Sequence, residues 1–168
     1  LHDALPILQI RSLGTLKLNS TKEYVNKYIT EFYQVDMFYR RTLEAYHELL
    51  TKENPIELVL NAAKRQLDLE YAKIANLLNL EWLTCVEEKG VWFTETGLKH
   101  QEDFYANESD PNVKQVVIIS DALRYEVAME LMQRLAKEKH MATIEAYQAM
   151  LPTETKFCKP SLLPYHSL

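Results

Sequence analysis

Two different patterns of apolar residues follow one another along the chain. In the first, which spans Ser20 to Leu50, apolar and aromatic residues recur at steps of three and four, at Val25, Ile29, Phe32, Val35, Tyr39, Leu43, Tyr46 and Leu50. This spacing predicts one stripe of a long helix. Ser20, followed by Glu23, fits a capping box, in which the hydroxyl accepts one backbone N–H and the carboxylate reaches back to another. The start of this helix is therefore well marked.

A second helix is expected after Asn54-Pro55. The residue before a proline is pushed out of the helical region, and the proline itself can occupy the first turn of the next helix. The apolar pattern then continues to about Leu83, with or without an interruption between Asn76 and Asn79. Residues 84–100 indicate a loop with a short strand or turn, and residues 101–112 are polar and acidic. We therefore expect a helical region over residues 8–110.

The second pattern begins at Val113. β-branched residues run from there to Ser120 without polar alternation, which is typical of a strand covered on both faces in a parallel sheet. Residues 122–139 then place apolar side chains on one helical face, and residues 142–150 form a weaker second strand. A strand, a helix and a strand in this order favour a right-handed parallel crossover. The predicted fold class is α/β, with the α/β domain starting at residue 111.

Composition and charge narrow the function without identifying it. A chain of 168 residues, 47% of them hydrophobic and 26% charged, fits one globular domain or one domain with an appendage. The net charge of -5 does not support a general nucleic-acid-binding surface. No apolar run is long enough to cross a bilayer, and no secretory leader opens the chain. Cys85 and Cys158 form neither a metal-ligand pair nor a disulfide framework, so we expect free thiols in a cytoplasmic protein.

Both ends of the sequence look unnatural. The chain begins at a leucine, and LHDALPI, residues 1–7, is interpreted as a non-native leader. At the other end LLPYHSL stops soon after a proline turn, without a closing helix or a charged tail. The α/β domain over residues 111–168 is therefore expected to be truncated.

Asp121 is the first candidate for chemistry. It lies between the apolar run and the predicted helix, and ligands of open α/β sheets lie beyond the carboxyl ends of the strands. Asp is also among the best N-cap residues, so position alone leaves a helix cap and a metal or phosphate role both open. The tripeptide DAL also occurs at residues 3–5 without a preceding strand. The tripeptide alone is therefore uninformative, and only the residues around Asp121 can indicate its function.

That context, VVIISDALRYEVAMEL, closely resembles the signature of the PglZ family, a branch of the alkaline phosphatase superfamily found in BREX-type bacterial phage-defence systems. In this family a leucine-proline segment with a hydroxyl residue, and then leucine-leucine-proline, follow the DALRYE motif. Here these parts read Leu151-Pro152-Thr153-Glu154-Thr155 and Leu162-Leu163-Pro164. Upstream, residues 33–43 and 101–105 resemble the helical region that precedes this domain in type A members.

The resemblance implies a metal-dependent phosphatase or phosphodiesterase. Superfamily members use a pair of divalent cations, usually zinc, to activate a Ser or Thr oxygen and to clamp the phosphoryl oxygens. By resemblance, Asp121 is a metal ligand and Thr155 is the nucleophile and a metal ligand. Thr153 is the alternative nucleophile, and either threonine could instead be a plain helix cap. The other Asp and His ligands of the superfamily come from later positions, so this chain alone is expected to be inactive.

Other features keep alternatives open. KFCKP, residues 156–160, stands where the family usually has glycine and small residues, and Pro160 removes a helical donor. Arg124 could face a phosphate or the solvent, and His140 and His166 show no ligand spacing. The alternative function is a non-catalytic phosphatase-like scaffold or assembly module of the defence complex. The partners implied are other BREX proteins, such as the DNA methyltransferase, besides a phosphate-ester substrate.

Overall fold

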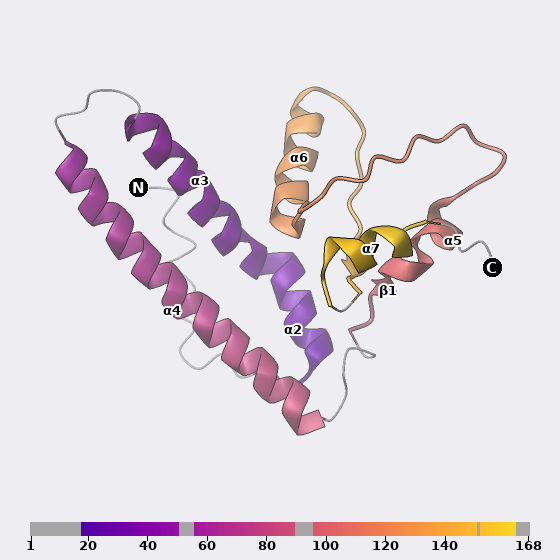
Figure 1. The fold of residues 1–168 in the computed structure, drawn as a ribbon, viewed down its shortest axis with the longest axis horizontal. Coiled ribbons are helices and arrows are strands. Elements are labelled where there is room, and N and C mark those ends of the chain that lie inside the picture. The colour runs from indigo at the N-terminus through magenta and orange to yellow at the C-terminus, as the bar shows by residue number, and fades with distance from the viewer. Residues whose placement is uncertain (1–17, 51–55, 90–95, 151, 164–168) are drawn as a thin grey trace. The chain divides into compact units, whose positions relative to one another are not determined.

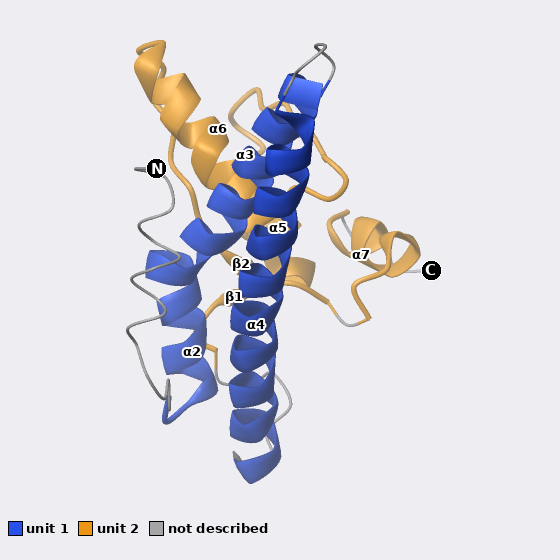
Figure 2. Ribbon diagram, turned by 90° about the vertical axis from the view of Figure 1, so that its left-hand side faces the viewer, with its two compact units in different colours: residues 1–95 blue, residues 96–168 orange. Residues whose placement is uncertain are grey.

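The structure is a computed structural model of the chain, and it describes residues 18–50, 56–89, 96–150 and 152–163. The chain divides into two compact units, residues 1–95 and residues 96–168 (Figure 2). This division lies upstream of the domain boundary expected at residue 111, and the domain limits themselves stay a prediction. Among the described residues, no helix combines the length and the apolar character needed to cross a membrane.

The first predicted helix is confirmed as one continuous helical path. It consists of α2 (Thr21–Lys27), a π-helical turn η2 (Tyr28–Phe32) and α3 (Tyr33–Leu50). One half of the predicted capping box is present, because the N-cap Ser20 Oγ accepts a hydrogen bond from the Glu23 backbone N–H at 3.1 Å. Glu23 Oε2 in turn accepts the backbone N–H of Asn19 at 2.9 Å. The bond to Ser20 satisfies an amide group that the first helical turn leaves unpaired, whereas the bond from Asn19 ties down the residue before the N-cap.

The second predicted helix is α4 (Glu57–Lys89), which packs along α2 and α3 (Figure 1). It extends past the expected end at Leu83 and continues without a break through Asn76 and Asn79. Both asparagine side chains are exposed, so neither leaves a buried polar group that would favour an interruption. The helix therefore continues at a small cost in helix propensity.

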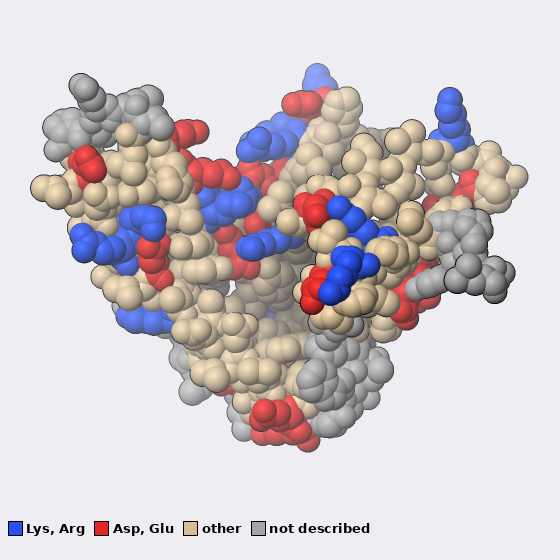
Figure 3. All heavy atoms as spheres, in the orientation of Figure 1, with Lys and Arg blue, Asp and Glu red and all other residues tan. Residues whose placement is uncertain are grey.

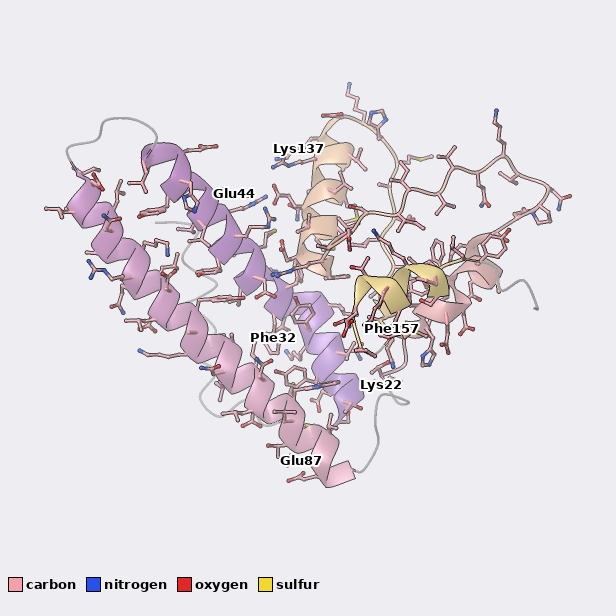
Figure 4. All side chains as sticks on the ribbon, viewed as in Figure 1. Lys22, Phe32, Glu44, Glu87, Lys137 and Phe157 are labelled. Atoms are coloured by element: carbon pink, nitrogen blue, oxygen red, sulfur yellow. The ribbon has the colours of Figure 1, made fainter. Side chains whose placement is uncertain are left out.

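Apolar and aromatic side chains fill the space between α4 and the helical path formed by α2, η2 and α3. Val35 and Ile74, exposed by 1% and 7%, form the centre of the cluster, and Leu67, Tyr71 and Leu78 pack against it. Further towards the start of α2, the Tyr24 ring makes edge contacts with Phe32, labelled in Figure 4, and with Trp82; the ring centroids are 6.4 and 5.3 Å apart, respectively. Burial of these side chains holds the helical pair together.

Tyrosine hydroxyls add a polar layer to the same interface. Tyr28 and Tyr71 donate to the two oxygens of Asp36 at 2.6 and 2.9 Å. Tyr39 donates to Asp68 Oδ1 at 3.0 Å. The Tyr39 ring also stacks on the Tyr71 ring, with 3.8 Å between the two ring centroids. The bonds of Tyr71 and Tyr39 join α3 to α4, so they favour one alignment of the two helices over shifted ones.

The second unit contains short elements. Along the chain they are β1 (Lys99–His100), η3 (Gln101–Asp103), α5 (Phe104–Glu108), α6 (Tyr125–Lys137), β2 (Tyr147–Gln148) and α7 (Thr155–Ser161). β1 and β2 pair in parallel, with Lys99 opposite Tyr147 and His100 opposite Gln148. Lys99 Nζ also binds carboxylate oxygens of Glu145 at 2.9 Å and Glu108 at 3.4 Å. The coarse prediction of an α/β fold is confirmed, although the described residues are mostly helical.

The predicted strand over residues 113–120 is wrong for this structure. These residues form no regular element, and Val116 and Ile118 are exposed by 82% and 86%. A strand needs a neighbouring strand to pair its backbone N–H and C=O groups, and the described sheet consists of β1 and β2 alone. The second predicted strand, 142–150, is reduced to β2, and its parallel partner lies at residues 99–100. The predicted crossover between 113–120 and 142–150 is therefore also wrong.

Candidate functional site

Asp121 lies in a turn that precedes α6. The next residue, Ala122, has a φ of 56°, in the left-handed region that non-glycine residues seldom adopt. Arg124 donates its backbone N–H to Ala122 O at 2.9 Å and is itself the N-cap of α6, where no side chain accepts a capping hydrogen bond. Asp121 therefore does not cap α6, and the capping interpretation of this residue is wrong.

Thr155 is the first residue of α7, and the structure brings it to Asp121. Its hydroxyl Oγ1 donates to Asp121 Oδ1 over 3.4 Å, a long and weak hydrogen bond between side chains 34 positions apart. Glu154 is the N-cap of α7 and makes no side-chain cap bond, so Thr155 is not a capping residue either. Within the described residues, no hydrogen bond joins Thr153 to Asp121. The geometry therefore favours Thr155 over Thr153 as the partner of Asp121.

Lys159 is a third member of the site. Its Nζ lies 3.2 Å from Asp121 Oδ2, so Thr155 and Lys159 each contact one oxygen of the same carboxylate. The two residues are four positions apart on α7 and therefore share a helical face. The sequence interpretation treated Lys159 only as a departure from the family pattern. Its spacing from Thr155 is the signal that could have identified it.

The electrostatics of the site favour a charged Asp121. The hydrogen bond and positive charge of Lys159 hold the pKa of the Asp121 carboxyl below its usual range, and the Thr155 hydroxyl and the Ala122 backbone amide act in the same direction. An ionised carboxylate is the form that binds a divalent cation. Because the group is exposed, solvent screens this interaction, and its contribution to stability is small.

Replacing Lys159 with methionine is expected to raise the pKa of Asp121 towards its ordinary value, because the main stabiliser of the carboxylate is removed. The pKa can be followed by NMR titration of the Asp121 carboxyl carbon. Lys156→Met is the matched control, since Lys156 Nζ pairs with Glu154 at 2.9 Å and not with Asp121. An equal rise in both variants would contradict the assignment of Lys159 to this site.

Contacts from Gln101 hold α7 in place. Gln101 Nε2 donates to Cys158 O at 2.8 Å, and Gln101 Oε1 accepts the Met150 backbone N–H at 3.2 Å. The buried Ser161 hydroxyl also donates to Cys158 O at 2.8 Å. Pro160 lies inside α7 and lacks a backbone donor, as the sequence indicated. The helix continues for one residue beyond it, so Thr155 and Lys159 keep their helical spacing.

The described residues supply only part of a metal site. Asp121 offers one carboxylate and Thr155 one hydroxyl, which are suitable hard ligands for a divalent cation. In the described ranges, no group of three or more His, Cys, Asp or Glu side chains is placed to hold an ion. His140 Nε2 lies 3.9 Å from Glu138 Oε2, and His166 falls outside the described residues. The donor set is thus compatible with a metal but incomplete.

Charges and cavities elsewhere do not add to this site. On the face shown in Figure 3, acidic and basic side chains are interspersed. An open cavity of about 680 Å³ is lined by residues of α5 and of the segment 109–118, among them Phe104, Glu108 and Val116. Neither Asp121 nor Thr155 lines it. The candidate site is therefore the exposed group of Asp121, Thr155 and Lys159.

Comparison with known proteins identifies the class of domain that carries this site. Residues 103–168 match the family described as "BREX system PglZ alkaline phosphatase-like domain". The second unit therefore contains an alkaline phosphatase-like domain sequence. Within that class the chain belongs to the PglZ family, as its DALRYE motif predicted. No solved structure matches the chain.

Two curated relatives support this assignment. The chain is 32% identical over 148 residues to the alkaline phosphatase-like protein PglZ of Bacillus cereus (strain H3081.97), which covers 84% of this chain. It is 40% identical over 80 residues to the alkaline phosphatase-like protein BrxZ of Escherichia coli O9:H4 (strain HS), which covers 43% of this chain. The matches span 17% and 9% of those relatives, respectively. The first match is longer than the second unit, so it includes part of the helical unit.

Proposed function

We propose that the chain is part of a metal-dependent phosphatase or phosphodiesterase-like protein of a bacterial phage-defence (BREX) system. In this proposal Asp121 is a metal ligand, and Thr155 is both a ligand and the nucleophile. The protein acts in the cytoplasm on a phosphate ester, together with other BREX proteins such as the DNA methyltransferase. The observation that carries the proposal is the 3.4 Å contact between Thr155 Oγ1 and Asp121 Oδ1.

The contact is informative because the family motif, independently of the fold, points to the same two residues. They are 34 positions apart, on a turn and on a separate helix, and a local capping role explains neither side chain. Nucleophilic hydroxyls of this class need a group next to them that lowers the energy of the alkoxide. A carboxylate that shares a cation with the hydroxyl provides such an environment.

Each residue then has a distinct task. Bound divalent cations, for which zinc is our proposal, would lower the pKa of the hydroxyl and offset charge on the phosphoryl group. Asp121 holds negative charge at the position where such a cation is needed. Thr155 presents its oxygen at the exposed start of α7, where a substrate has access. Lys159 offers a cation one helical turn away, where it can pair with a phosphate oxygen once Asp121 has another partner.

Metal content tests the role of Asp121. In the full-length protein that contains these residues, Asp121→Ala is expected to lower the bound zinc measured by mass spectrometry and to abolish hydrolysis of an aryl phosphate. Asp103→Ala removes an exposed carboxylate outside the site and is expected to change neither value. Wild-type zinc content together with wild-type turnover in Asp121→Ala would show that this carboxylate is not a ligand.

A non-catalytic role in the defence complex is the second candidate. The helical unit favours it, because several leucines on α4 are exposed. In that case the full-length protein would lack phosphoesterase activity whatever its metal content. The same zinc and turnover measurements on the wild-type protein therefore separate the two functions.

A further inference from the structure

Helix α4 carries apolar residues on two opposite sides. One side holds Leu67, Ile74 and Leu78, which belong to the core cluster. The other side carries Leu69, Leu80 and Leu83, which are exposed by 58%, 63% and 51%. At about 100° per residue these three leucines lie within one narrow band, opposite the core side. A helix that is apolar on both sides is normally covered on both.

Residues of the exposed band recur every eleven positions. We define the outer stripe as Arg65, Leu69, Asn76, Leu80, Leu83 and Glu87, all exposed. Leu69 and Leu80 are eleven positions apart, and so are Arg65, Asn76 and Glu87 in succession. An eleven-residue repeat closes after three turns at about 3.67 residues per turn, so such a stripe stays on one side of an almost straight helix. It is suited to contact with a second helix along its whole length.

The charges on the outer stripe are complementary to those of a second copy of α4. Arg65 and Glu87 lie at equal distances on either side of Asn76, with opposite charge. An antiparallel pair of α4 helices related by a two-fold axis at Asn76 places Arg65 of each copy against Glu87 of the other. Leu69 then faces Leu83. A parallel pair would instead oppose equal charges, which is unfavourable.

Other features of the stripe fit the same arrangement. Within the described parts of the chain, neither Arg65 nor Glu87 has a hydrogen bond or an ion pair, so both are available to a partner. The axis brings the two Asn76 amides together, and a buried asparagine pair can fix the alignment of two helices. Ala72 faces Leu80 of the other copy, so that a small side chain meets a large one.

We propose that the chain self-associates through the outer stripe of α4, as an antiparallel two-fold pair centred on Asn76. The inference goes beyond the proposed hydrolase function and does not depend on it, because no residue of the stripe belongs to the site at Asp121. The paired stretch from Arg65 to Glu87 is about 33 Å long. Pairing through this stretch would make the helical unit an assembly surface.

Charge reversal tests the pairing by sedimentation equilibrium on the purified chain. The wild type is expected to dimerise. Arg65→Glu and Glu87→Arg, each alone, are expected to weaken the dimer by about tenfold or more, because each places like charges opposite one another twice. The double variant Arg65→Glu/Glu87→Arg restores opposite charges and should recover dimerisation. Glu57→Lys, outside the paired stretch, should have no effect. All substituted side chains are exposed. Circular dichroism verifies that each variant keeps the helical content of the wild type.

A cysteine at the axis tests the geometry directly. In a Cys158→Ser background, Asn76→Cys is expected to form a disulfide-linked dimer under mild oxidation, since the two residues face each other. Leu58→Cys is the matched control, because the same axis places it beyond the end of the other α4. A monomeric wild type, a double charge variant that fails to recover, or equal cross-linking at residues 58 and 76 would each overturn the proposal.

Discussion

Replacing Ile74 with alanine is expected to lower the free energy of unfolding of the helical unit by about 2–5 kcal/mol. Ile74 is exposed by 7% and packs in one cluster with Val35, which is exposed by 1%. Truncation removes buried apolar surface and leaves a cavity between two helices whose positions are also fixed by the tyrosine bonds to Asp36 and Asp68. Because those bonds hinder collapse of the cavity, we expect a value well inside this range.

Urea unfolding followed by circular dichroism measures this loss. Ile74→Val removes one methylene and should cost about 0.5–1.5 kcal/mol, which gives a graded series at one position. Leu58→Ala is the matched control on the same helix, because Leu58 is exposed by 85% and its truncation should change stability by less than about 0.5 kcal/mol. Equal losses for Ile74→Ala and Leu58→Ala would show that α4 does not pack on this side.

The helical unit could be predicted from local spacing because both helices are long and periodic. Spacing alone did not reveal the π-helical turn at Tyr28–Phe32, since one additional residue per turn hardly disturbs steps of three and four. It also treated Tyr39 as an apolar residue. The hydroxyl of Tyr39 binds Asp68, 29 positions away, and such a partner is set by tertiary packing rather than by the local pattern.

The second unit shows where local patterns fail. The β-branched run at 113–120 has strand propensity, but strand formation depends on pairing with another strand. A short strand within residues 84–100 was expected, and β1 lies there at Lys99–His100, but its parallel pairing with β2 could not be predicted from local pattern. The motif nevertheless located Asp121 and Thr155, which the structure brings into contact. Lys159 was missed as a site residue because a charged side chain at an unexpected position was interpreted as divergence and its helical spacing from Thr155 was overlooked.

The choice between Thr155 and Thr153 as the nucleophile can be tested by its large effect on phosphoesterase turnover. If the proposed function holds, Thr155→Ala in the full-length protein should lower phosphoesterase turnover by about three orders of magnitude or more, because the attacking oxygen is lost. Bound zinc should be largely retained, since the Asp121 carboxylate remains. Thr155→Ser keeps a hydroxyl at the start of α7 and should preserve much of the activity.

Thr153→Ala is the matched control for this experiment. Thr153 is a threonine two positions earlier, also exposed, and it makes no hydrogen bond with Asp121 within the described residues. Its loss should leave turnover close to that of the wild type. The opposite result, an inactive Thr153→Ala beside an active Thr155→Ala, would transfer the nucleophile to Thr153 and make the contact between Thr155 and Asp121 structural. Turnover and zinc content measured on the same samples separate loss of the nucleophile from loss of the metal, because only the latter changes both values.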